Sequence, residues 1–228
     1  IQEGKLFLLQ TRNGKRTAKA AVKIAIDMEH EGLINKKDAI VRINPKDLDG
    51  LLHPTFTDKA IKENEASATG LAASPGAAVG KISFTAKDAA YRSDKGENVI
   101  LVREETSPED LEGMVKAKGI LTARGGMTSH AAVVARGMGK CCVSGASEVH
   151  INEDEETMRI GDKVYTKEDT ISLDGSTGNV YIGALSTQSP QLEGDFGEFM
   201  GWVDEFRDMK IRTNADTPRD VAQALEFG

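Results

Sequence analysis

The sequence has few cysteines and no long apolar run, and each absence excludes a class of protein. Its two cysteines are the adjacent pair Cys141 and Cys142. Secreted scaffolds usually carry more, and adjacent cysteines seldom bridge. No apolar stretch approaches the roughly 20 residues that a membrane-spanning helix needs, and the first residues lack the apolar core and cleavage site of a signal peptide. We therefore expect a cytoplasmic protein with free thiols and no membrane partner.

The sequence also has fewer basic than acidic residues. The 228 residues include 29 Lys plus Arg against 36 Asp plus Glu, which gives a formal net charge of −7. Proteins that bind the phosphate backbone of nucleic acids are typically basic, so we expect no nucleic-acid partner. His30, His53 and His150 are scattered, and no metal-ligand spacing is present. We therefore expect no metal site within this chain.

Changes in composition predict five segments. Residues 5–12 read as a strand without a partner, and residues 210–228 read as one strand followed by one helix. Neither makes a fold alone, so we expect each to be part of a larger domain that is incomplete here. The predicted segments are a domain remnant at 1–16, a helical linker at 17–69, a central domain at 70–184, a linker helix at 185–209 and the start of a further domain at 210–228.

Helices are predicted on both sides of the central domain. Apolar residues recur at helical spacing over 17–31 and again over 193–210. A short helix is expected to start at Asn35 and to end at Asn44, because the residue before a proline avoids helical geometry. The stretch 58–70 is polar and rich in small residues, and we interpret it as part of the linker.

Short apolar runs separated by glycines characterise residues 70–184. A helix is predicted over 107–118, with Ser107 as its cap and Pro108 in its first turn, and another over 127–139. Many short strands with two helices predict a compact α/β domain. The predicted strands are 81–85, 98–104, 119–123, 140–145, 163–166, 170–174 and 179–183.

The segment 124–130 carries the most informative chemistry. Two glycines follow a predicted strand, and Thr-Ser-His then opens a helix. The glycines permit a tight turn and leave room for a phosphate. Thr128 or Ser129 can cap the helix, which places His130 in the first turn beside free N–H groups. A helix N-terminus favours anions over imidazolium, so we expect His130 to be neutral and nucleophilic, with its phosphorylated form held by backbone amides.

Residues 124–136 (RGGMTSHAAVVAR) resemble the phosphohistidine signature of the phosphoenolpyruvate-utilising enzymes, and within that family they are most similar to the pyruvate phosphate dikinases. Further family landmarks follow in order along the chain. Leu9–Arg12 resembles the last strand of the ATP-grasp domain. The swivelling domain is matched by Gly70–Lys81 at its opening and by Gly161–Asp162 and Ile171–Tyr181 at its closing strands, and the pyruvate-binding barrel is matched by Lys210–Pro218 at its start.

This resemblance implies a compact swivelling β/β/α phosphohistidine domain with helical linker segments on both sides. It implies that ATP, with inorganic phosphate, phosphorylates His130, and that the phosphoryl group passes to pyruvate to form phosphoenolpyruvate, with AMP and pyrophosphate released. The ATP-grasp domain and the TIM barrel would be partners in the same chain. Gln10 and Arg12 would contact the nucleotide, and the Mg²⁺ ligands would lie in the neighbouring domains, so this chain would bind no cofactor. We expect a homodimeric complete enzyme, but a monomeric fragment without turnover of its own.

The supporting residues have alternative roles. Gly125 and Gly126 are expected to provide the backbone geometry of the turn, with positive φ at Gly126. Thr128 and Ser129 are expected to cap the helix. The resemblance further implies regulatory phosphorylation of Thr128, as in plant dikinases. Arg124 either reaches the phosphoryl group or forms a surface ion pair, and Arg136 is expected to be structural.

Two other functions of the chain stay open. One is the carrier domain of phosphoenolpyruvate synthase, which uses water; the other is a non-catalytic swivelling interaction module.

Overall fold

The fold is described from a computed structural model of the chain, for residues 2–12, 14, 16–190, 194–210, 212–215 and 218–227. The chain divides into two compact units. The larger is built from residues 44–192 with the N-terminal residues 1–18, and the smaller from 19–43 with 193–228. Helices and sheets alternate in the larger unit, which confirms the predicted α/β class. None of the described helices is both long and apolar enough to cross a lipid bilayer.

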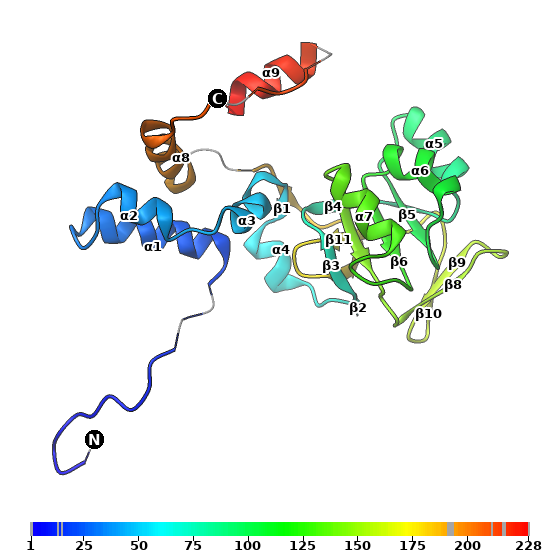
Figure 1. Ribbon diagram of the computed structural model, residues 1–228. Helices are drawn as coiled ribbons and strands as arrows, with labels where there is room; N and C mark the ends of the chain where they lie inside the picture. The colour runs from blue at the N-terminus through cyan, green and yellow to red at the C-terminus, as the bar shows by residue number, and fades with distance from the viewer. Residues whose placement is uncertain are drawn as a thin grey trace. The chain divides into compact units, whose positions relative to one another are not determined.

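An eight-stranded mixed sheet forms the centre of the larger unit (Figure 1). Its strand order is β2-β12-β11-β4-β5-β6-β7-β3, in which β4 to β7 run parallel and the outer pairs are antiparallel. The strands are β2 (Ala68–Thr69), β3 (Leu71–Ser74), β4 (Ala77–Ser83), β5 (Val99–Arg103), β6 (Gly119–Thr122), β7 (Cys141–Ser144), β11 (Thr170–Asp174) and β12 (Asn179–Ile182). Six of the seven predicted strands are thus confirmed, apart from shifts at their ends, and the seventh, 163–166, matches a strand of the second sheet.

Helices link the parallel strands. They are α5 (Ala86–Asp94), α6 (Leu111–Lys116), which follows the 3₁₀ turn η2 (Pro108–Asp110), and α7 (His130–Gly137). Val99 and Leu101 of β5 pack in the cluster that contains helix residues, whereas Ile100 and Val102 pack in the cluster of the opposite face. Successive side chains of a strand point to opposite faces, so β5 is buried on both sides, as is typical of a central parallel strand.

A second small sheet packs against the outer face of the large one. Its order is β10-β9-β8, with β8 at Val149–Asn152, β9 at Thr157–Ile160 and β10 at Lys163–Tyr165. Buried Val149 and Met158 join the core cluster that contains Ile82 and Leu173. The sequence analysis missed β8 and β9, because the acidic run between them hides a hairpin turn.

Residues 44–69 belong to the larger unit rather than standing apart as a linker. They contain α3 (Pro45–Leu48), the 3₁₀ turn η1 (Asp49–Leu52), β1 (Thr55–Phe56) and α4 (Asp58–Glu63). Strand β1 pairs with β13 (Thr187–Gln188), and β2 pairs with β12. Phe56 and Ala60 are buried with Tyr181 and Leu185. The polar stretch 58–70 therefore holds a helix and an edge strand that its composition does not reveal.

The smaller unit is helical, as predicted. It contains α1 (Ala18–His30), α2 (Lys36–Val41), α8 (Asp195–Phe206) and α9 (Pro218–Phe227). The Asn35 side chain accepts the N–H of Asp38 and caps α2. Helices α1 and α8 are joined by the pair His30 Nε2–Glu198 Oε1 at 2.8 Å, and Trp202 meets the ring of His30 edge-on.

Two predicted strands are wrong. Residues 2–12 form only an isolated bridge between Gln2 and Lys5, and Leu6 to Leu9 are exposed. Of the predicted strand 210–216, residues 210 and 212–215 have no strand geometry, and residues 211 and 216 lie outside the described residues. A strand needs a neighbour to satisfy its N–H and C=O groups, and the described chain places none beside these segments. Helix α5 was missed for another reason: its buried face is made mainly of alanines.

Burial of Phe56 gives a test of the revised boundary. Phe56→Ala should lower the free energy of unfolding by about 3–4 kcal/mol, because a fully packed aromatic ring is removed. Phe7→Ala is the matched control: Phe7 is 54% exposed and Phe56 only 3%, so the control should change stability by less than about 0.5 kcal/mol. Urea unfolding of the 228-residue chain measures both. Equal effects would mean that residues 44–69 do not share the core.

Candidate functional site

The signature loop leaves the sheet at the end of β6. The N–H groups of Ala123 and Arg124 donate to the carbonyl oxygens of Arg103 and Glu104, at 3.1 and 2.9 Å. The loop therefore runs beside the segment that follows β5, before it turns into α7. It lies at the carboxyl edge of the parallel strands, where open α/β sheets bind their ligands.

The turn of this loop depends on Gly125. Its φ is +112°, and an added Cβ would lie 2.9 Å from the Ser129 Cβ and 3.0 Å from the Ser144 Oγ. Gly145 faces it from the loop after β7, also with a positive φ, and a Cβ there would collide with the Gly125 carbonyl oxygen. Gly126 has no positive φ and no atom within 4 Å of an added Cβ. The expectation of positive φ at Gly126 is thus wrong, and Gly125 is the constrained position.

Hydroxyl groups support the loop from below. Ser129 is the N-cap of α7, and its Oγ accepts the N–H of Ala132 at 3.4 Å. The same Oγ lies 3.3 Å from the Ser144 Oγ, to which Thr122 Oγ1 donates at 3.1 Å. Thr122 and Ser144 are fully buried. Of the two predicted caps, Ser129 is therefore the one used, while Thr128 is exposed and its hydroxyl has no hydrogen bond within the described residues.

His130 is the first residue of α7, and its ring is held through one nitrogen. Its Nδ1 lies 3.0 Å from the Oγ1 of Thr106, in the segment after β5. When Nδ1–H donates to Thr106, the Nε2 nitrogen carries a free lone pair. In the part of the chain that the structure describes, Nε2 makes no hydrogen bond. The arrangement therefore offers an oriented nucleophile at the N-terminus of a helix, where a phosphoryl group would meet backbone N–H groups.

The segment that contains this site is similar to a known family. Residues 95–178, which include the signature loop and His130, match the model of the PEP-utilising enzyme, mobile domain. This segment is therefore similar to the mobile domain of the PEP-utilising enzymes. Over all 228 residues it is 58% identical to pyruvate, phosphate dikinase of Clostridium symbiosum, of which it covers 26%. It is 55% identical to pyruvate, phosphate dikinase 2 of Oryza sativa subsp. japonica, again covering 26%, and 53% identical to the chloroplastic enzyme of Mesembryanthemum crystallinum, covering 24%.

The chain thus spans about a quarter of the length of these relatives. The family resemblance inferred from residues 124–136 is confirmed, because the matched mobile domain contains that signature.

The segment that carries Thr106 is braced on two sides. Arg103 donates to the carbonyl oxygen of Phe84 at 3.0 Å and forms ion pairs with Glu153 at 3.2 Å and Asp110 at 3.6 Å. Asp110 in turn accepts the N–H of Ser107 at 2.9 Å. Thr106 was missed by the sequence analysis. The available signal was its position just after a predicted strand, because neighbouring parallel strands end at one edge of the sheet.

Two arginines flank the mobile-domain signature, and each has a structural partner. Arg124 Nε lies 2.9 Å from Glu104 Oε1, and the Arg124 side chain is 72% exposed. This favours the surface-pair alternative for Arg124. Arg136 donates to the carbonyl oxygens of Ala132 and Met127. It therefore ties the first turn of α7 to the preceding loop, as expected for a structural residue.

The other candidates lie away from His130. Arg12 donates to Gln10 at 3.3 Å on the exposed N-terminal segment, and no contact among the described residues joins either to the signature loop. Cys141 and Cys142 are buried on β7, as predicted, and burial raises the pKa of both thiols, that of Cys142 to about 12. No group of three or more His, Cys, Asp or Glu side chains suited to a metal ion occurs in the described residues.

The two glycines give a matched test of the loop. Gly125→Ala should lower the free energy of unfolding by about 2 kcal/mol, because positive φ is strained for alanine and the new Cβ crowds Ser129 and Ser144. Gly126→Ala should change it by less than about 0.5 kcal/mol. Thermal unfolding of both variants is the measurement. A larger loss at Gly126 would contradict the assignment of the turn to Gly125.

Proposed function

We propose that this chain is the phosphoryl carrier of a pyruvate, phosphate dikinase, with His130 as its covalent acceptor. One observation carries the proposal: the His130 imidazole is held at Nδ1 by Thr106, at the start of α7, with Nε2 free. The same residues lie within the segment that matches the mobile domain of the PEP-utilising enzymes. The relatives named above carry the name of this dikinase, which favours it over phosphoenolpyruvate synthase.

In the proposed reaction, the phosphoryl group is carried on the Nε2 nitrogen of His130 between its donor and its acceptor. The Nε2 lone pair attacks the β-phosphorus of ATP; the N–P bond forms as the P–O bond to AMP breaks. Inorganic phosphate then takes the outer phosphoryl group and leaves as pyrophosphate. The phosphoryl group that remains passes to the enolate oxygen of pyruvate, which gives phosphoenolpyruvate and restores His130. A covalent intermediate lets two distant sites share one reaction.

The residues around His130 have distinct parts in this scheme. The Thr106 hydroxyl oxygen accepts a hydrogen bond from Nδ1–H in the reactive tautomer, so Nε2 stays available for attack. Ser129 starts α7 at His130, so the new negative charge lies by the free N–H groups of the first turn. Gly125 shapes the turn and Gly126 leaves its outer side open. Thr128 is exposed two residues before His130, and its accessibility supports the proposal that it is the site of regulatory phosphorylation.

The remaining parts of the proposal concern the larger protein. We infer an ATP-grasp remnant at 1–16 with Gln10 and Arg12 as nucleotide contacts, and the start of a pyruvate-binding barrel at 210–228. Between them we infer linkers at 17–43 and 193–209 and a carrier domain at 44–192, wider than the 70–184 expected from the sequence. Mg²⁺ would serve the phosphoryl transfers from the neighbouring domains, because the described residues of this chain offer no suitable ligand group. A homodimeric complete enzyme and a cytoplasmic location are expectations from the sequence.

Replacement of His130 tests the carrier function. The chain can be exchanged for the matching segment of the Clostridium symbiosum enzyme, to which it is 58% identical. With ATP labelled at the β-phosphorus, the chimera should retain acid-labile, base-stable label on the protein. His130→Asn should abolish the label, because the amide has no nucleophilic nitrogen.

His150→Asn provides the control, because His150 is exposed on β8. This variant should keep full labelling, and circular dichroism should show both variants folded. Full labelling of the folded His130→Asn variant would exclude His130 as the acceptor and leave the interaction module as the function. Pyruvate turnover that needs no inorganic phosphate would instead identify a phosphoenolpyruvate synthase.

Thr106 can be tested separately from His130. Thr106→Val keeps the shape of the side chain but removes the acceptor at Nδ1, so the ring loses its fixed tautomer and orientation. The rate of labelling should fall by about 10- to 100-fold, the scale expected for a misplaced reacting group. Thr106→Ser retains the hydroxyl and should restore most of the rate. Rapid-quench labelling of the chimera measures this, and equal rates for the valine and serine variants would contradict an orienting role.

A further inference from the structure

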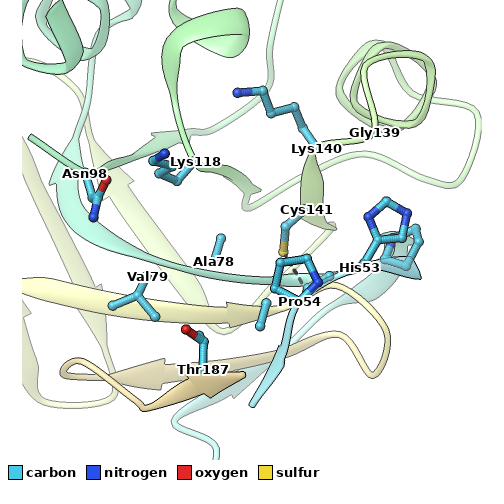
Figure 2. A pocket seen from close by; sticks show the side chains of 13 residues that line it. His53, Pro54, Ala78, Val79, Asn98, Lys118, Gly139, Lys140, Cys141 and Thr187 are labelled. Atoms are coloured by element: carbon cyan, nitrogen blue, oxygen red, sulfur yellow. Dashed lines mark hydrogen bonds between the residues drawn. The ribbon is translucent and has the colours of Figure 1, made fainter. Parts of the chain in front are cut away.

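A pocket lies at the end of the parallel strands opposite to His130. Figure 2 shows that its wall includes Asn98, Lys118 and Lys140, which directly precede β5, β6 and β7. His53 and Pro54, which directly precede β1, close another side together with the start of β4 and Thr187 of β13. The pocket has a volume of about 300 Å³, which is at the small end of the range for sites that bind small molecules.

The charge of this pocket is positive, although the chain as a whole is acidic. No carboxylate lines it, and the chain has a net charge of −7. Other lysines have carboxylate partners, such as Lys81 with Glu168 and Lys116 with Asp94. Within the described residues, Lys118 and Lys140 form no ion pair. The pocket therefore holds two ammonium groups whose charge the chain itself does not compensate.

The position of Lys140 is fixed by the protein. Its Nζ donates at 2.7 Å to the carbonyl oxygen of Ala117, the C-cap residue of α6. This bond brings it beside Lys118, the next residue along the chain. Burial and the nearby charge of Lys118 both lower the pKa of Lys140. Two like charges held close together are destabilising, and an anion bound between them would relieve this.

The rest of the lining combines apolar and polar residues. Pro54, Pro75, Ala78 and Val79 are apolar, whereas His53 and Thr187 are polar. In Figure 2 Ala78 and Val79 lie between Thr187 and the two lysines. A ligand that fills the pocket needs an anionic end for the lysines and a compact apolar body for this surface.

We propose that the pocket binds a small phosphate monoester, with its phosphate between Lys118 and Lys140 and its apolar body against Pro54 and Val79. A phosphate dianion matches two ammonium groups, whereas a carboxylate would leave one of them uncompensated. Asn98 supplies a neutral amide donor at the rim. No residue of the signature loop lines the pocket, so the proposed site is separate from the one at His130.

Calorimetric titration of the 228-residue chain tests this site. Phenyl phosphate is the main probe, and inorganic phosphate and benzoate are the comparison probes. Phenyl phosphate should bind most tightly, inorganic phosphate more weakly because it lacks the apolar body, and benzoate more weakly because it has one charge. Lys118→Gln and Lys140→Gln should each weaken phenyl phosphate binding about tenfold, since each removes a charge-assisted contact.

Lys163→Gln is the matched control, because Lys163 is exposed on β10 and forms no ion pair in the described part of the chain. It should leave the affinity unchanged. Asn98→Asp is a second test variant, and it leaves both lysines in place. A carboxylate at the rim should weaken phenyl phosphate binding about tenfold by repulsion. The proposal is overturned if phenyl phosphate does not bind at millimolar concentration, if benzoate binds equally well, or if the folded lysine variants bind like the unaltered chain.

Discussion

The parallel pairing of β5 with β6 is the constraint on which the site depends. Arg103 and Thr122 are paired at the ends of these strands, so the segments that follow them leave the sheet at the same edge. One segment carries Thr106 and the other carries His130, which are 24 positions apart in the sequence. Their hydrogen bond, the Arg124–Glu104 ion pair and the backbone bonds of Ala123 and Arg124 all follow from this single register.

Local signals in the sequence predicted the parts of the site that local contacts determine. The cap at Ser129, the first-turn position of His130 and the cap at Asn35 each depend on residues within a few positions. Thr106, Ser144 and Gly145 could not be found in this way, because their contacts with the loop cross from one strand end to another. Sequence patterns also missed α5 and α4, whose buried positions are alanines rather than large apolar residues.

The two edges of the parallel sheet differ in electrostatic character. Helix α7 begins at the carboxyl edge, and its free N–H groups favour a bound anion at His130. Helix α6 ends at the amino edge, where its last carbonyl groups favour cations, and Lys140 donates to one of them. This carbonyl oxygen satisfies one hydrogen bond of the Lys140 ammonium group, but the charge of Lys140 is still opposed by that of Lys118. The direction of the strands thus places the proposed phosphoryl site and the uncompensated lysines at opposite ends of the sheet.

The proposed carrier function requires a histidine that is held firmly and is yet accessible to partners on the outside. Support and accessibility are provided on opposite sides of the signature loop. Beneath it, Thr122 and Ser144 are fully buried and link the N-cap Ser129 to β6 and β7. Above it, Gly126 and Thr128 are exposed. Because the ring is fixed through Nδ1 from the side of Thr106, Nε2 needs no protein partner, and the nitrogen proposed to react remains free for a ligand brought by another domain.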